Sequence, residues 1–98
     1  MQFLVTGTDG TDEKALERRL AARDAHLKGV AEASGKNEHL YGAALLDEAG
    51  KMIGSFLVVE YPDRDALDAW LKTEPYVLGG VWERVEVTPC KVAATFMR

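Results

Sequence analysis

Runs of apolar and β-favouring residues, several of them with every second residue apolar, predict four β-strands. They cover residues 2–6, 38–46, 52–61 and 81–87. A polar loop of hairpin length separates the second run from the third. The segment from Gly7 to Gly10 is predicted to end the first strand, and residues 92–97 are predicted to form a further short strand in the tail.

Two other segments follow the period of a helix. The first, over residues 12–33, places apolar side chains on one stripe at spacings of 4, 7 and 3, at Leu16, Leu20, Leu27 and Val30. Thr11 or Asp12 is the predicted N-cap of this helix. The second helix begins after Asp63, its predicted N-cap, and ends before Pro75, because a residue before proline is disfavoured in the α region.

The predicted order of elements is β-α-β-β-α-β. This order is typical of a ferredoxin-like α+β fold, in which two helices cover one face of a four-stranded antiparallel sheet. The 98 residues suffice for one such domain, over 1–98. Phe56 and Val58 alternate with Leu57 and Val59, so the third strand is apolar on both faces. We therefore expect a homodimer in which the open sheet faces of two copies pack together.

Composition and charge disfavour several classes of partner. The net charge of −4 disfavours nucleic acid, because phosphate binding requires a basic surface. No apolar run approaches the roughly 20 residues of a membrane span, and the N-terminus lacks the features of a signal peptide, so we expect no membrane partner and a cytoplasmic location. Cys90, the single cysteine, forms no internal disulfide and suits a reducing compartment; we expect it to pack rather than react.

His26 is the first candidate for chemistry. Helical phase places His26 and Arg19 together on one border of the apolar stripe, with Arg23 inside it. A residue on this border can face a groove between helix and sheet. A lone histidine on a helix edge is more often structural than catalytic, so phase alone leaves both interpretations open. The positions of His26 and His39 do not predict a metal site.

Five segments along the chain match one known pattern. They are residues 16–20 with Arg23-Asp24-Ala25-His26-Leu27, which looks like R-x-x-H-L; Tyr41-Gly42-Ala43; Gly54-Ser55; residues 69–81, which are similar to W-x-x-x-D-P-Y/F-x-x-x-G-V; and Val85-Glu86-Val87-Thr88-Pro89. In this order and spacing they resemble the YCII-related family, within the dimeric α/β-barrel (ferredoxin-like) group. The resemblance covers nearly the whole chain.

The resemblance implies a small protein with a histidine and an aspartate in a cleft. A few members of the family are lyases or dehydrochlorinases acting on ring compounds. His26 matches the family histidine, whereas Glu74 stands where the family usually has aspartate and Ala43 where it often has proline. The longer glutamate moves the carboxylate by about one methylene, and displacements of that size can lower a rate strongly.

A histidine paired with a carboxylate is typical of general base catalysis. A neutral imidazole takes up a proton near pH 7, and a carboxylate on its other nitrogen fixes the tautomer and stabilises the imidazolium. We therefore predict His26 and Glu74 as catalytic residues. They suit proton abstraction next to a carbonyl, followed by elimination or isomerisation, with neither a metal nor a cofactor.

Four further residues are predicted to bind the substrate. Arg19 and Arg23 are candidates for holding an anionic group, and Ser55 and Tyr76 for donating hydrogen bonds to an oxygen that gains charge. Three of them also have a structural interpretation: Arg23 in pairing with Asp24 or a partner chain, and the two hydroxyls in satisfying backbone groups. The alternative to a lyase or isomerase is a dimer that binds a small ligand without turnover, or an accessory module.

Overall fold

A computed structural model describes residues 1–97; residue 98 of the predicted domain lies outside the described part. Four strands and three helices follow one another, with a short 3₁₀ helix near the C-terminus. Their bounds are β1 Gln2–Asp9, α1 Ala15–Gly35, β2 His39–Leu46, β3 Met52–Glu60, α2 Arg64–Leu71, α3 Pro75–Leu78, β4 Trp82–Cys90 and η1 Ala94–Phe96.

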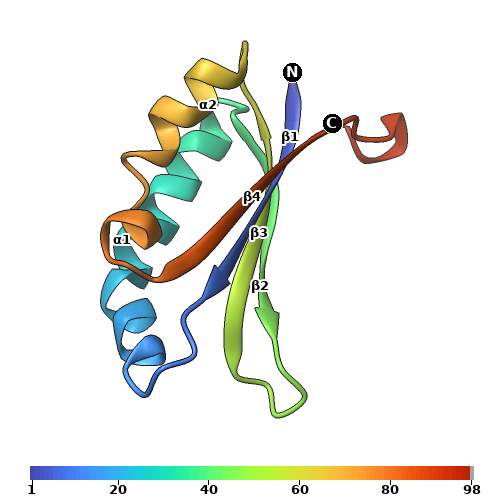
Figure 1. The fold of residues 1–98 in the computed structure, drawn as a ribbon. Helices are drawn as coiled ribbons and strands as arrows, with labels where there is room; N and C mark the ends of the chain where they lie inside the picture. Colours follow the sequence, from blue (N-terminus) through green and yellow to red (C-terminus); the bar gives the residue numbers. More distant parts are fainter. Residues whose placement is uncertain (98) are drawn as a thin grey trace.

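The strands form one antiparallel sheet in the order β2-β3-β1-β4. The α-helices lie together on one face of this sheet; the opposite face carries no α-helix, and the 3₁₀ helix η1 lies on that side (Figure 1). This architecture confirms the predicted ferredoxin-like α+β fold. β1 and β3 are the central strands, so the residues that alternate along them decide what lies beneath the helices.

The core lies between the sheet and the helical layer. Phe3 and Val5 of β1 and Leu57 and Val59 of β3 point towards the helices and are almost completely buried. The core is completed by buried aromatic and aliphatic residues from the second half of the chain, namely Tyr61, Leu67, Tyr76, Val81 and Trp82. Burial of this apolar surface is the main favourable contribution to folding.

The first strand is longer than predicted, because Gly7 does not end it. Gly7 pairs with Ser55 of β3 and Val85 of β4, and β1 continues to Asp9. A Cβ atom at position 7 would lie 2.4 Å from the indole ring of Trp82. The glycine is therefore needed for the close approach of Trp82 to the sheet, and the predicted break at this position was wrong.

The predicted apolar stripe of α1 is only partly correct, since Val30 packs against the core and Leu16 is half-buried but the other two residues are exposed. Leu20 and Leu27 are 53% and 46% exposed, whereas Arg19 and His26 belong to the buried face of the helix. The reason is that polar groups of the sheet and of the loop before α3 satisfy these two side chains, as described below. Leu27 instead borders a cavity between α1 and the sheet.

The predicted ends of the elements are only partly correct. Asp63 caps α2 by accepting a hydrogen bond from the amide of Ala66, as predicted. α1 begins three residues after Asp12, whose carboxylate accepts a hydrogen bond from the amide of Lys14 and pairs with Arg18 instead of capping the helix. The strand predicted over 92–97 is wrong, because this segment contains the 3₁₀ helix Ala94–Phe96.

The open face of the sheet carries a set of apolar side chains. Leu4 and Val58 are paired across β1 and β3, and Tyr41 stacks on Phe56 at a ring-centroid distance of 6.2 Å. Tyr41 is 66% exposed. The expected homodimer through this face stays a prediction. Within residues 1–97, no helix has the length and apolar character of a membrane-crossing segment.

Candidate functional site

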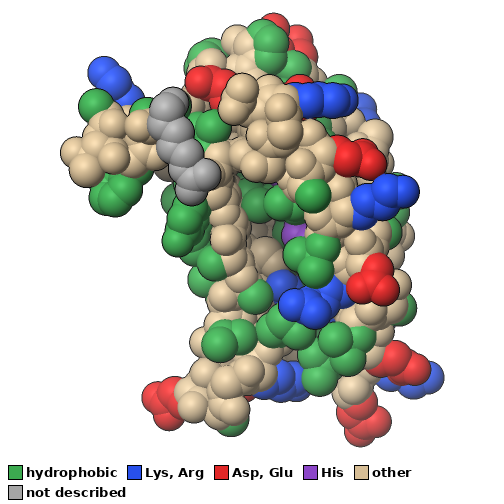
Figure 2. All heavy atoms as spheres, turned by 180° about the vertical axis from the view of Figure 1, so that it is seen from behind, with side chains coloured by type: hydrophobic (Ala, Val, Ile, Leu, Met, Phe, Trp, Pro, Cys, Tyr) green, Lys and Arg blue, Asp and Glu red, His purple; other side chains and the backbone are tan. Residues whose placement is uncertain are grey.

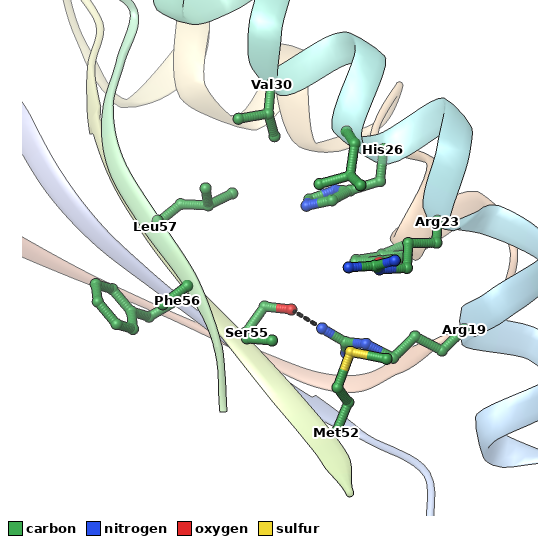
Figure 3. Close-up of a pocket in the computed structure, with 13 residues that line it drawn as sticks. Arg19, Arg23, His26, Val30, Met52, Ser55, Phe56 and Leu57 are labelled. Carbon is green, nitrogen blue, oxygen red and sulfur yellow. Dashed lines mark hydrogen bonds between the residues drawn. The ribbon is translucent and has the colours of Figure 1, made fainter. Parts of the chain in front are cut away.

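A cavity of about 180 Å³ lies between α1 and the neighbouring strands β2 and β3. Figure 2 shows a recess on this side of the molecule, with a histidine side chain visible inside it and basic side chains next to it. The cavity is lined by Arg19, Arg23, His26, Leu27 and Val30 of α1, Gly42, Ala43 and Ala44 of β2, Met52, Ser55, Phe56 and Leu57 of β3, and Tyr76 of α3. Polar residues thus gather on the α1 side and at Ser55 (Figure 3).

His26 and Glu74 are in direct contact. Nδ1 of His26 lies 2.5 Å from Oε1 of Glu74, and both side chains are buried. The same oxygen accepts a hydrogen bond from the amide of Tyr76 at 3.1 Å, so Glu74 is also the N-cap of the short helix α3. Pro75 at the first position of α3 fixes the direction of the chain after Glu74. The longer glutamate therefore reaches the imidazole.

The contact with Glu74 sets the tautomer of His26. A carboxylate accepts hydrogen bonds, so Nδ1 carries the hydrogen and Nε2 of the neutral ring has a free lone pair. Nε2 has no hydrogen-bond partner among residues 1–97. The imidazole borders the cavity and stacks on the ring of Tyr76, with 4.0 Å between the two ring centroids. Figure 3 shows the imidazole of His26 pointing from α1 towards the cavity.

Both terminal nitrogens of Arg19 are held by protein groups, whereas its buried Nε has no hydrogen-bond partner among residues 1–97. Its Nη1 donates to both carboxylate oxygens of Asp9, at 2.8 and 2.9 Å, and its Nη2 donates to the carbonyl of Gly54 and to Oγ of Ser55. The guanidinium also lies 4.8 Å from the ring centroid of Tyr76. Because Asp9 balances its charge within the protein interior, Arg19 borders the cavity as half of an ion pair.

Arg23 differs from Arg19 in both exposure and partners. It lies one helical turn after Arg19, borders the same cavity and is exposed. It forms no salt bridge with any group in residues 1–97, including the neighbouring Asp24. Of the two arginines predicted to bind substrate, Arg23 is thus the one whose charge is available to a ligand.

Ser55 and Tyr76, the two predicted hydroxyl donors, both border the cavity and are both buried. Burial raises the pKa of the Tyr76 hydroxyl, and the nearby charge of Arg19 opposes this shift. Tyr76 therefore remains a protonated donor at neutral pH. Five of the six predicted site residues border one cavity, and the sixth, Glu74, does not line it but contacts His26. Hydrogen bonds join His26 to Glu74 and Arg19 to Ser55.

Two residues around the site were not predicted from the sequence. Asp9 pairs with Arg19, and the indole N–H of Trp82 donates to Oγ of Ser55 at 3.4 Å. A signal for Asp9 was present, because it continues the alternation of Phe3 and Val5 towards the buried face of β1. Within residues 1–97, no three His, Cys, Asp or Glu side chains are grouped as metal ligands.

Comparisons with known proteins agree with this architecture. The chain is 31% identical to the protein YciI of Escherichia coli, over 93% of this chain and 97% of that protein. Its structure is similar to that of 5-chloro-2-hydroxyhydroquinone dehydrochlorinase (TftG) from Burkholderia phenoliruptrix in complex with 2,5-dihydroxybenzoquinone, with a TM-score of 0.81, 22% identity and 97% and 98% of the two chains covered. An antibiotic biosynthesis monooxygenase is more distant in structure, with a TM-score of 0.56, 19% identity and 95% and 99% of the chains covered.

The sequence profile of the YCII-related domain matches residues 1–91. This match includes every strand and every α-helix of the structure and all six predicted site residues. The chain belongs to the YCII-related family.

Proposed function

We propose that the protein is a small enzyme that needs no cofactor and uses His26 as a general base. One observation carries the proposal: Nδ1 of His26 is held by a buried carboxylate while the same ring borders a cavity. A histidine with only a structural role has no need of an accessible cavity, and a simple binding site has no need of an oriented base. The arrangement matches the base and the orienting group of known proton-transfer sites.

The proposed reaction begins with a carbon acid next to a carbonyl group. Nε2 of His26 takes the proton, and the electron pair of the C–H bond moves towards the carbonyl oxygen. Glu74 stabilises the imidazolium, because its carboxylate already accepts the hydrogen bond from Nδ1. The negative charge that develops on the substrate oxygen lies in a cavity that Arg23 borders. The enolate then expels a leaving group, or takes a proton back at another carbon.

The structural neighbour supports the elimination branch of this scheme. TftG is a dehydrochlorinase, and its structure contains a dihydroxybenzoquinone. Loss of hydrogen chloride combines proton abstraction with departure of chloride, which is the sequence of steps available to His26. We therefore propose a lyase- or isomerase-type reaction on a small ring-containing or anionic substrate.

We further propose that the working unit is a cytoplasmic homodimer. The apolar open face, including the 66% exposed Tyr41, supports this proposal, because a second sheet would bury these side chains. Static light scattering is expected to give about twice the chain mass of 10.8 kDa at micromolar concentration. A mass equal to one chain would exclude the dimer.

A substrate screen on two variants tests the enzymatic proposal. Chlorinated hydroxyhydroquinones are incubated with the protein, and chloride release and incorporation of solvent deuterium are followed. His26→Ala is expected to abolish turnover while the protein remains folded. Lys28→Ala, at an exposed position on the same helix, is expected to keep the turnover of the wild type. Turnover that survives in His26→Ala would refute the role of His26. Binding without turnover in the wild type would favour a ligand-binding module.

A further inference from the structure

The hydroxyl of Ser55 lies between two groups that can only donate hydrogen bonds. Nη2 of Arg19 lies 2.7 Å from Oγ of Ser55, and Nε1 of Trp82 lies 3.4 Å from it. A guanidinium and an indole N–H have no acceptor capacity. Oγ therefore acts as an acceptor in both contacts.

This arrangement determines where the hydroxyl hydrogen of Ser55 points. A serine oxygen has two acceptor lone pairs and one hydrogen to donate. Arg19 and Trp82 occupy both lone pairs, and no group within residues 1–97 accepts the hydrogen. Ser55 is only 3% exposed and borders the cavity, so the remaining direction for its O–H leads into the cavity. Figure 3 shows Ser55 on β3 facing the guanidinium of Arg19.

The guanidinium of Arg19 is fixed in place, so it continues to donate to Oγ of Ser55 and the Ser55 hydroxyl hydrogen keeps its direction. Nη1 is held by both oxygens of Asp9 and Nη2 by the carbonyl of Gly54, and the Arg19 and Asp9 side chains are only 2% and 4% exposed. A rotation of the guanidinium would leave buried charges without partners, which is strongly unfavourable. The chain of contacts from Asp9 through Arg19 thus holds Ser55 as a donor of fixed direction.

We infer that the cavity selects a ligand with a negatively charged oxygen, such as an enolate, phenolate or carboxylate oxygen, placed against the Ser55 hydroxyl. Arg23, which has no ion-pair partner in residues 1–97, supplies the balancing charge. Asp9, Arg19 and Trp82 are positioning residues, because they act on the ligand through Ser55. This inference rests on the proposed function and specifies its substrate class: the oxygen at Ser55 is the one that gains charge when His26 removes a proton.

The same polarity predicts which ligands the cavity rejects. An amine or amidinium at the same place would direct its hydrogens at the Ser55 hydroxyl hydrogen and its charge at Arg23. Neither the Ser55 hydroxyl nor the Arg23 guanidinium has a free acceptor for the hydrogens of such a ligand, and the positive charges of the ligand and Arg23 repel each other. Benzoate and benzamidinium have the same shape but opposite charge, and the first accepts hydrogen bonds where the second donates them. They therefore test the polarity of the cavity.

Binding of these two probes to the intact protein tests the inference without any turnover. Benzoate is expected to shift the amide NMR signals of residues around the cavity, and benzamidinium to bind at least tenfold more weakly. Ser55→Ala is expected to weaken benzoate binding roughly tenfold or more, as for a lost hydrogen bond to a charged group. Lys28→Ala, outside the cavity, serves as the control and is expected to leave both affinities unchanged.

Trp82→Phe distinguishes positioning from a general loss of structure. Without the indole N–H, one lone pair of Ser55 becomes free and the hydroxyl can rotate, so the ratio of benzoate to benzamidinium affinity is expected to fall. A purely structural defect would lower both affinities and leave their ratio unchanged. Equal binding of the two probes to the wild type, no binding of benzoate, or an unaltered ratio in Ser55→Ala would overturn the inference. The binding of the two probes is measured without turnover, whereas the proposed role of His26 is tested by the turnover of His26→Ala. The failure of one proposal can therefore be told apart from the failure of the other.

Discussion

Oε1 of Glu74 accepts hydrogen bonds from both Nδ1 of His26, at 2.5 Å, and the amide of Tyr76, at 3.1 Å. One oxygen thus orients the imidazole and caps the helix α3. The position of the base relative to the cavity is therefore coupled to the local fold of the segment that follows α2.

This shared oxygen predicts different effects for two substitutions of Glu74. Glu74→Ala leaves the Nδ1 hydrogen and the α3 amide without an acceptor in the interior, so we expect a loss of roughly 1–3 kcal/mol in the free energy of unfolding. Glu74→Gln keeps an oxygen acceptor and is expected to cost less. Urea denaturation of the two variants measures this difference.

The two Glu74 variants are expected to behave alike in turnover. Neither supplies a negative charge to stabilise the imidazolium, so both are expected to lower kcat by about 100-fold or more for the substrate that the screen identifies. Near-normal kcat in Glu74→Gln, with the stability order as predicted, would show that Glu74 has a structural role only.

The pair of Asp9 and Arg19 makes a second prediction, about stability. Both side chains are almost completely buried, so Asp9→Ala leaves the guanidinium charge uncompensated and is expected to cost about 3–5 kcal/mol. The matched control is Asp12→Ala, which removes an exposed carboxylate from Arg18 and is expected to cost far less. Similar denaturation midpoints for the two variants would contradict this account of Arg19.

Most of the fold could be predicted from the sequence because strand alternation and turn residues are local signals. The burial of α1 could not, because its buried face contains Arg19 and His26 while Leu20 and Leu27 are exposed. A hydrophobic period assumes that polar residues face water. Here Asp9 and Glu74, distant in sequence, provide the partners that allow two polar side chains to be buried.

The candidate site was predicted only in part for the same reason. His26, Glu74 and the cavity-lining hydroxyls follow from the family pattern, but the partners of Arg19 and Ser55 depend on how β1, β3 and β4 lie side by side. That arrangement brings Asp9 and Trp82 to the site through pairing across the sheet. The different roles of Arg19 and Arg23, one turn apart on α1, follow from these contacts and not from helical phase.

Gly7 provides a third prediction. In Gly7→Ala the added Cβ would lie 2.4 Å from atoms of the Trp82 ring, so the indole or the strand must shift. We expect a loss of about 1–3 kcal/mol, as for overpacking of a core, together with weaker benzoate binding because Trp82 contacts Ser55.

Gly29→Ala is the control for this substitution. Position 29 lies within α1, and an added Cβ there would have no neighbour within 4 Å. The same chemical change is therefore expected to stabilise the protein by roughly 0.5–1 kcal/mol, because alanine favours the helix. Thermal and urea denaturation of both variants test the pair, and a stabilised Gly7→Ala would contradict the packing of Trp82 on β1.

His39 makes the last prediction, which concerns pH. Its ring is buried beside Trp70, at a centroid distance of 4.7 Å, and its Nε2 lies 3.4 Å from the hydroxyl of Tyr61. Nδ1 has no hydrogen-bond partner among residues 1–97. Burial lowers the pKa of His39 below its ordinary value of 6.5, although the negative charges of Glu74 and Glu38 act in the opposite direction.

A lowered pKa in the folded state means that the unfolded chain binds the proton first as the pH falls. The stabilising contribution of neutral His39 is therefore complete above the unfolded pKa of 6.5 and is lost as the pH falls through the lower folded value. Urea denaturation at a series of pH values from neutral to mildly acidic measures this loss. His39→Gln, which keeps a polar side chain but does not titrate, is expected to show a shallower decline than the wild type. Parallel pH profiles for the two proteins would mean that His39 is not the group responsible.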